Sequence, residues 1–524
     1  MVNLAPMGEP GSETPNTEDS PPKKRWRQRV WWVRYLTYLS TFLALLIGTY
    51  AYFDFRGRLR WKAYLEEIEA SGSSLDIRKL VPPAPEEGSF WEDYAVTRIL
   101  DKKTGGFDVF PNPDELDADF AGLINPGKWK YGSRRELSDS FPNSSLTSEQ
   151  AARRLLKVLS SSDEQIAFEK ALGKPVGGFP WPESHLDRIK STPRLPSLSS
   201  IRWWQIQAHC HIELKHGEEA MEPILLSFAL SSHLDSSGSF IPVILSHSIV
   251  GSTFEVLWNG LQRRIWKEPE LGVLADTLAN WQQEKSKFEM VAQRERALMN
   301  SHIEVYCAGF ASRLSTIRSG VFEPIWNPDL PTIYSPFYEL TSESVTAVNE
   351  GLWLIIPTSV IRANLRDRDQ LNRDTLLNPS LPLNERIELE AQRITEWENG
   401  LFLPPSKALI TYSFGGILKK VSEVDQWILI IRAAVAAERH FLKYRVYPQT
   451  WDEMVPEWLP EVPRDVWSGR DLIYSIGPEG RPVIYSVGEN EVDDGGTPKA
   501  LKSQGDLVWR YFLPQGFTVD DYEN

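Results

Sequence analysis

The pattern of apolar and polar positions changes sharply near the start of the chain. Residues 35–53 carry no charged side chain, and a basic run over 23–29 comes shortly before them. As a helix, this apolar stretch would be about 28 Å long, close to the roughly 30 Å hydrocarbon core of a bilayer. Aromatic residues flank both of its ends, where their rings favour the headgroup boundary. The pattern predicts a single transmembrane helix over 30–54.

The basic residues around this helix predict its orientation, because Lys and Arg collect on the cytoplasmic side. A cleaved signal peptide is the alternative, although the apolar region and the segment before it are longer than those of a typical signal peptide. We expect the N-terminus inside, because more basic residues precede the helix (Lys23, Lys24, Arg25, Arg27, Arg29 and Arg34) than follow it closely (Arg56, Arg58, Arg60 and Lys62).

The rest of the chain divides into four further regions. Residues 1–29 begin with a stretch rich in Pro, Glu, Ser and Thr, which predicts a disordered cytoplasmic tail. Residues 55–195 should form a membrane-proximal helix, over 54–80 and stopping near Gly72, followed by an irregular region. Residues 196–424 should form an α-helical body, and 425–524 a small α+β module.

Helical periodicity is clearest in the middle of the chain. Residues 201–215 and 218–234 flank His216-Gly217 and predict a helical hairpin. One further helix is expected to begin near 147. Others are expected over 241–263, 271–300, 344–376 and 383–400. The fold class is therefore mainly α, and an irregular helical body fits better than a solenoid because no fixed repeat is present.

The last hundred residues have a different pattern. A helix is predicted over 425–443, ending at Tyr447-Pro448. Short strands follow over 471–476 and 483–487 around a Gly- and Pro-containing turn, and 507–512 adds a third strand. This order predicts an antiparallel hairpin beside one helix.

Composition restricts the function classes. The formal net charge of −14 argues against nucleic-acid binding, which normally needs a basic face. Cys210 and Cys307 have no metal-binding spacing, and the sequence leaves open whether they form a disulfide or stay free. We expect the clustered tryptophans to belong mainly to the core: Trp203, Trp204, Trp451, Trp458, Trp467 and Trp509.

A set of short segments in the last hundred residues forms a recognisable pattern. It includes Ala437-Glu438-Arg439, Tyr447-Pro448, Val462-Pro463-Arg464-Asp465, Tyr485-Ser486-Val487-Gly488 and Asp493-Asp494-Gly495-Gly496. The chain thereby resembles a family of uncharacterised bacterial single-pass membrane-anchored proteins, over most of its length after the apolar segment and strongly over 437–510. The resemblance implies an anchor followed by a helical body in the periplasm, attached to the bacterial inner membrane, and it implies no activity.

The same module is similar to the globular tail of type II secretion pseudopilins, in which an acidic Gly-rich loop holds calcium. That resemblance, and the hard oxygen ligands that calcium prefers, predict a calcium site here. The alternative is a solvated acidic turn. A filament subunit is not expected, because the apolar helix is far from this module. The candidate ligands are Glu489, Glu491, Asp493 and Asp494.

A second candidate metal site is His209, Glu213 and His216, whose spacing places them on one helix face. The alternative is that they are polar positions of an amphipathic hairpin. Nucleophile-elbow, phosphate-loop and dinucleotide motifs are absent from the sequence. We expect a non-enzymatic envelope protein that binds other envelope proteins; the alternative is an exported metal-assisted hydrolase.

Overall fold

The computed structural model describes residues 23–101, 147–159, 163–190, 198–283, 288–308, 357–399, 414–498 and 505–512. The described chain is mainly α-helical with one small sheet, as the periodicity predicted. The beginning of the expected tail, 1–22, and most of the expected irregular region lie outside the described residues.

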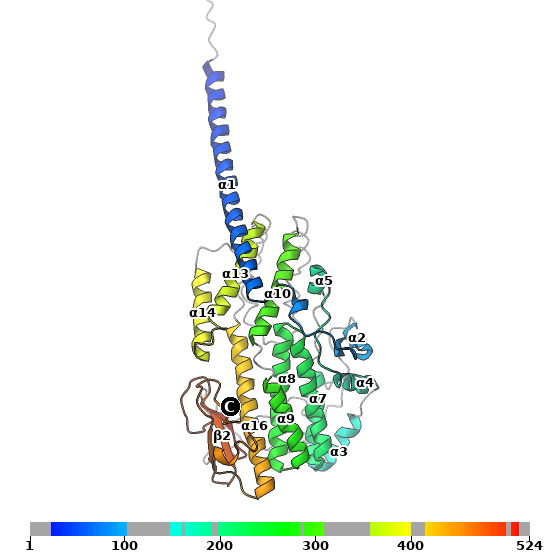
Figure 1. The fold of residues 1–524 in the computed structure, drawn as a ribbon. Coiled ribbons are helices and arrows are strands. Elements are labelled where there is room, and N and C mark those ends of the chain that lie inside the picture. Colours follow the sequence, from blue (N-terminus) through cyan, green and yellow to red (C-terminus); the bar gives the residue numbers. More distant parts are fainter. Residues whose placement is uncertain are drawn as a thin grey trace, which may run out of the picture.

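Helix α1 (Lys23–Ala70) is one continuous helix of 48 residues that projects from the body (Figure 1). It includes residues 23–29, which the sequence analysis assigned to the tail, and it joins the expected membrane helix to the helix expected over 54–80. No proline interrupts it, so the helix propagates through both segments. The helix stops before Gly72, whose φ of +69° only glycine adopts easily.

The two halves of α1 have different surroundings. The side chains from Trp31 to Phe53 are exposed in the structure, and the helix is long and apolar enough to cross a membrane by these two criteria alone. From Asp54 onward the helix packs against α13 (Thr358–Asp374). Ser359 donates a hydrogen bond to Asp54 Oδ1 at 2.7 Å, and a Cβ added to Gly57 would lie 2.7 Å from the Ser359 backbone.

The body is built around antiparallel helices that the sequence largely predicted. The hairpin over 201–234 is confirmed as α6 (Leu198–Glu213) and α7 (Gly217–Ser236), and α8 (Phe240–Arg263) follows. The single helix expected over 271–300 is instead two helices, α9 (Glu268–Gln283) and α10 (Phe288–Cys307), whose link lies outside the described residues.

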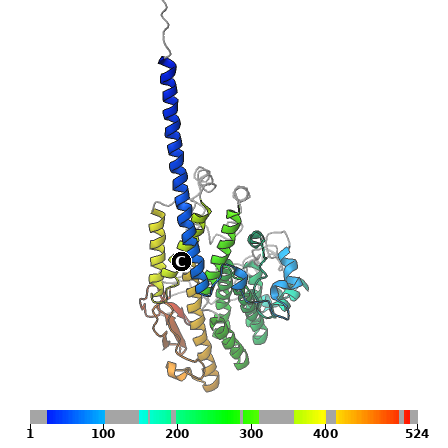
Figure 2. The ribbon, with the colours of Figure 1, turned by 45° about the horizontal axis from the view of Figure 1, so that its top comes forward.

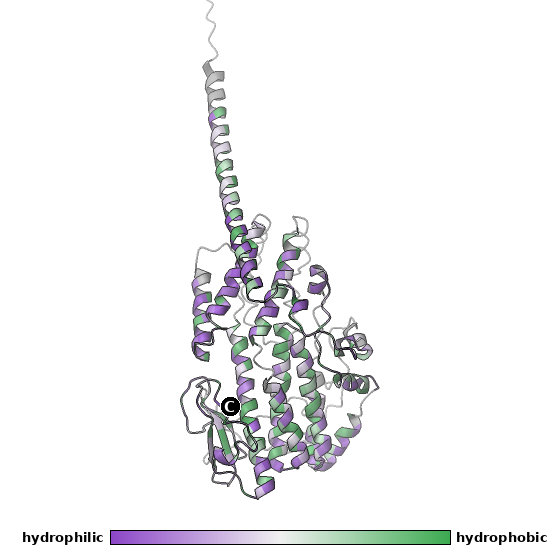
Figure 3. Ribbon diagram, viewed as in Figure 1, coloured by the Kyte–Doolittle hydropathy of each residue, from purple (hydrophilic) through white to green (hydrophobic). Residues whose placement is uncertain are grey.

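Shorter elements surround this core. Thr147 caps α3 with a reciprocal side-chain pair with Gln150, as its sequence indicated. Helices α13 and α14 (Leu383–Asn399) are mainly hydrophilic (Figure 3). The remaining helices are η1 (Ile77–Lys79), η2 (Phe90–Glu92), α2 (Tyr94–Asp101), α3 (Ser148–Val158), α4 (Asp163–Leu172), α5 (His185–Lys190) and η7 (Trp451–Glu453).

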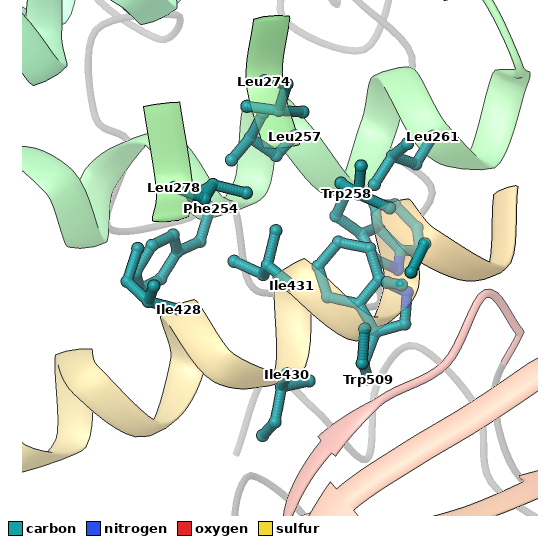
Figure 4. Close-up of a cluster of buried hydrophobic side chains, with 14 of the residues drawn as sticks. Phe254, Leu257, Trp258, Leu261, Leu274, Leu278, Ile428, Ile430, Ile431 and Trp509 are labelled. Carbon is teal, nitrogen blue, oxygen red and sulfur yellow. The ribbon is translucent and has the colours of Figure 1, made fainter. Parts of the chain in front are cut away.

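The largest core cluster forms where α16 (Gly415–Tyr444) packs against α8, α9 and the sheet. Figure 4 shows Ile428 and Ile431 of α16 beside the side chains of α8 and α9, with Trp509 joining from the C-terminal strand. Helix α8 also has the length and composition of a membrane span, but 61% of its apolar 18-residue stretch is buried inside the protein. We therefore assign α8 to the protein core.

The sheet has the order β1-β2-β3, with both neighbouring pairs antiparallel. Its strands, β1 (Ile473–Ile476), β2 (Pro482–Ser486) and β3 (Leu507–Trp509), confirm the predicted hairpin and third strand. The expected domain boundary between 424 and 425 falls inside α16. Because one core cluster contains residues from both sides of that boundary, the α+β module shares its core with the helical body.

We expect Gly57→Ala to destabilise the docking of α1 on α13. The new methyl group would press on the Ser359 backbone, and forced contacts of this kind typically cost about 1–3 kcal/mol. Gly48→Ala is the matched control, because nothing lies within 4 Å of that position outside its own helix. Thermal unfolding of the full chain in detergent measures both; equal midpoints for the two variants would contradict the packing described.

Candidate functional site

Helices α8 and α16 both end on the side of the body opposite the projecting half of α1 (Figure 1, Figure 2). Residues at these two helix ends line a pocket. Its volume is about 590 Å³. Four arginines and a single glutamate are among the residues that line it, which are Gln262, Arg263, Arg264, Phe441, Arg445, Val446, Tyr447, Glu479, Gly480, Arg481 and Phe512.

Two helix ends place the exposed arginines at this pocket. Arg264 ends α8 and Arg445 ends α16, and each adopts the left-handed conformation, with φ of +52° and +62°. The Arg445 amide donates to the carbonyl of Phe441, which closes the last turn of α16. Glycine is the usual residue at such positions, so arginine here accepts some backbone strain. These positions place the two arginines at the C-terminal ends of α8 and α16.

The other walls come from the C-terminal module. Gly480, with φ of +71°, turns the chain between β1 and β2 and so brings Arg481 to the pocket. The segment after β3 is held against α8, because Trp258 Nε1 donates to the carbonyl of Arg510 at 2.7 Å and Gln262 donates to the carbonyl of Tyr511 at 2.9 Å. Phe512 thereby reaches the pocket rim.

A buried charge network forms the floor of the pocket. The guanidinium of Arg481 donates to Glu438 Oε1 at 2.6 Å, and both side chains are almost fully buried. Arg481 also donates to the carbonyls of Gln262 and Leu261, so it caps the C-terminal end of α8. Its guanidinium lies 3.5 Å from the centre of the Tyr511 ring. Nearly all of the hydrogen-bonding capacity of Arg481 is therefore used inside the protein.

The hydroxyl of Tyr447 connects this floor to the pocket mouth. It donates to Glu438 Oε1 at 2.7 Å and accepts hydrogen bonds from Arg264 and Arg481 at 2.7 and 3.1 Å. Burial, reinforced by the Glu438 carboxylate, raises the pKa of Tyr447 to about 12. The phenol therefore keeps its proton at neutral pH and remains a donor to Glu438.

The arginines differ in what they still offer to a ligand. Arg263 donates to Asn259 and to Glu213 at 2.9 and 2.6 Å, so it is already engaged. Arg264 lies 4.0 Å from the centre of the Phe441 ring, gives one amino group to Tyr447, and has its Nε 3.7 Å from Glu438 Oε2, which leaves its other amino group without a hydrogen bond or ion pair among the described residues. Arg445 is exposed, and within the described part of the chain its side chain has no hydrogen bond or ion pair. Arg264 and Arg445 are therefore the available donors.

Each of the four predicted calcium ligands has a contact of its own with another part of the protein. Glu489 pairs with Lys419 at 2.6 Å, and Glu491 accepts a hydrogen bond from Asn384 at 3.0 Å. Asp493 accepts from the hydroxyl of Tyr485, and the Asp494 amide donates to the buried Asp506. Among the described residues, no three His, Cys, Asp or Glu side chains are arranged to hold one metal ion. Calcium binding at this loop stays a prediction.

The structure does not bring together His209, Glu213 and His216 as one ligand set. His209 is buried beside Asn259, with a nitrogen-to-nitrogen distance of 3.2 Å, and burial lowers its pKa to about 3, with a smaller contribution from Arg263. Glu213 pairs with Arg263. The ring of His216 lies near that of His211 instead, with centroids 5.9 Å apart. Glu213 and His216 therefore fit the alternative given above, that they are polar positions of a helical hairpin.

Other residues singled out in the sequence belong mainly to the core. Cys210 and Cys307 are free thiols in different clusters. Four of the six tryptophans are buried, and Trp451 and Trp458 are partly buried. The pocket arginines were missed, because their signal is weak: Arg264 and Arg445 follow helical stretches where a stop residue is expected, and nothing in the sequence pairs Arg481 with Glu438.

Comparison with protein-family models, curated proteins and solved structures finds no match for this chain. The resemblances to a membrane-anchored family and to pseudopilin tails therefore stay predictions. The function has to be inferred from the geometry alone.

We expect Arg481→Met to destabilise the protein by about 3–5 kcal/mol, because it leaves the Glu438 carboxylate buried without its main partner. The double variant Arg481→Met with Glu438→Gln should recover most of that loss, since the uncompensated charge is gone. Urea unfolding of the full chain in detergent measures both. A single variant as stable as the unmodified protein would show that the ion pair contributes nothing.

The buried His209 predicts a stability that depends on pH. The unfolded chain takes up a proton near pH 6.5, whereas the folded protein does so only near pH 3. Stability should therefore fall as the pH drops below 6.5, by about 2 kcal/mol from this residue between pH 7 and 5. His209→Gln should reduce the difference in unfolding free energy between these two pH values. An unchanged difference would contradict a histidine that is neutral when buried.

Proposed function

We propose that this chain is a single-pass membrane protein that binds another envelope protein through its helical body. The observation that carries the proposal is the change of surroundings along α1. Its apolar side chains are exposed up to Phe53, and contacts with the body begin at Asp54. An exposed apolar surface of this length is stable in water only if something covers it.

A lipid bilayer fits that surface in length and in chemistry. The exposed stretch matches the thickness of a hydrocarbon core, and Trp31, Trp32 and Tyr52 are near its two ends. The basic run that starts at Lys23 precedes it, which supports an N-terminus in the cytoplasm and a body on the other side.

The junction between the membrane and the body supports a fixed placement rather than a flexible tether. The second half of α1 is held to α13 by the Asp54–Ser359 hydrogen bond, by the close approach at Gly57 and by an ion pair between Arg373 and Glu67 at 2.5 Å. Arg296 joins Asp369 of α13 to Ser73, just beyond the end of α1. The body is therefore attached rigidly to the helix that we propose crosses the bilayer.

A binding role, rather than an enzymatic one, accounts best for the far end of the body. Its pocket offers guanidinium groups and exposed apolar side chains, which serve recognition, and among the described residues we find there no paired nucleophile and general base. The alternative, a metal-assisted hydrolase, would have its site near His209 or at the acidic loop over 489–494, and His209 is buried beside Asn259.

Carbonate extraction combined with cross-linking tests this proposal. Intact membranes are cross-linked, washed with carbonate and separated; the chain should stay in the pellet with a stoichiometric envelope protein attached. Replacing Leu43 and Leu46 with arginine should release it, because each charge near a bilayer centre costs about 3 kcal/mol. Ile166→Arg, at an exposed apolar position of the body, is the control and should leave the chain in the pellet.

Three results would contradict the proposal in whole or in part. Release of the unmodified chain by carbonate would exclude a membrane span, and an intact mass that lacks residues 1–53 would show that the segment is a cleaved signal. Retention without any cross-linked partner in repeated preparations would leave the anchor but reject the binding role.

A further inference from the structure

We propose that the arginine-lined pocket binds an acidic peptide segment of the partner protein, one in which a carboxylate is next to an aromatic or aliphatic side chain. This inference rests on the proposed binding function and assigns that function to one place. Helices α8 and α16 end at the side of the body opposite the projecting half of α1 (Figure 1), and the residues that line the pocket include those at both helix ends.

Charge is the first argument. Four arginines but only one acidic side chain, Glu479, line the pocket, although the chain as a whole carries a net charge of −14. A local positive surface attracts acidic groups and disfavours basic ones. Carboxylates pair with arginine through two parallel hydrogen bonds, which adds direction to the attraction.

The state of each arginine is the second argument. Arg481 and Arg263 are engaged within the protein, and Glu438 and Glu213 balance their charges, so the positive charge that a ligand meets comes from Arg264 and Arg445. Arg264 is held over the Phe441 ring, by Tyr447 and near Glu438, and its second amino group remains as a donor for a ligand. A guanidinium fixed in this way loses little freedom on binding. Arg445, exposed at the end of α16, lines the same pocket and adds a second guanidinium.

The apolar part of the pocket is the third argument. Val446 is 53% exposed and Phe512 is 45% exposed, and both line the pocket beside the arginines. Exposed aromatic and aliphatic side chains next to cations match a peptide that alternates acidic and apolar residues, because one contact adds burial and the other adds direction. Inorganic anions would use only the cations and leave this surface uncovered.

The floor of the pocket explains why the ligand would be an anion rather than a cation. Glu438 is the only carboxylate at the centre of the network, and Arg481 at 2.6 Å, Tyr447 at 2.7 Å and Arg264 at 3.7 Å already surround it. A cationic ligand at the floor would therefore have to displace one of these partners, and Glu479 is the single acidic side chain among the lining residues. An anionic ligand adds to the network without breaking it.

Fluorescence anisotropy with a defined probe tests the assignment. The probe is a fluorescein-labelled peptide of alternating aspartate and phenylalanine, titrated with the full chain in detergent. Arg445→Glu and Arg264→Gln should each weaken binding at least ten-fold, because each removes one of the two available guanidinium groups. Arg153→Glu is the control. It changes an exposed arginine of α3 that does not line the pocket, and it should leave the affinity unchanged.

Three outcomes would overturn the proposal. The first is that the probe does not bind, or binds Arg445→Glu as tightly as the unmodified chain. The second is that a peptide with asparagine in place of aspartate binds equally well. The third is that inorganic phosphate displaces the probe at a lower concentration than N-acetyl-aspartate does. That result would assign the pocket to a phosphate-bearing ligand instead.

The same variants separate this inference from the proposed function. If a partner is still cross-linked in membranes that contain Arg445→Glu and Arg264→Gln, the binding role stands and only its placement at this pocket is wrong. If the variants lose the cross-linked partner but keep the carbonate-resistant anchor, both proposals are supported. Thermal unfolding of Arg445→Glu serves as the folding control, because that side chain is exposed.

Discussion

The burial of α16 on nearly all sides is the constraint on which the rest of the structure depends. Its middle turns, which include Ile428, Ile431 and Val435, contact α8 and α9 on one side and the strands on the other (Figure 4). A helix that is apolar all round is stable only when neighbours cover it on every side. The helical body and the sheet are therefore parts of one core, and neither can bury its apolar surface without the other.

The position of the pocket follows from this shared core. Because α8 and α16 pack against each other, they end at a similar level, and the unsatisfied carbonyls of the α8 end need donors. Arg481 supplies them from the sheet, and its charge is balanced by Glu438 of α16. The buried ion pair thus joins three elements at one point. It also explains how a charged side chain can be almost fully buried at the edge of an apolar core.

Much of this architecture could be predicted from the sequence, because it depends on local patterns. The hairpin around His216-Gly217, the cap at Thr147 and the strands around Gly480 each have a short-range signal, and the structure contains all three. The extent of α16 could not be predicted, since its first ten residues look like a connecting segment until the rest of the core is present. The candidate site was equally hidden. Its residues come from segments around 264, 441–447, 481 and 512, and only folding brings them together.

The absence of a break in α1 has a geometric consequence for the whole molecule. A helix turns by about 100° for each residue, so the direction in which the body faces is tied to the number of residues between the bilayer and Asp54. If α1 crosses a bilayer, it fixes both the distance of the body from the bilayer and the rotation of the body about the helix axis. A neighbour in the same membrane would then meet a particular side of the body, and a single inserted residue in α1 would turn another side toward it.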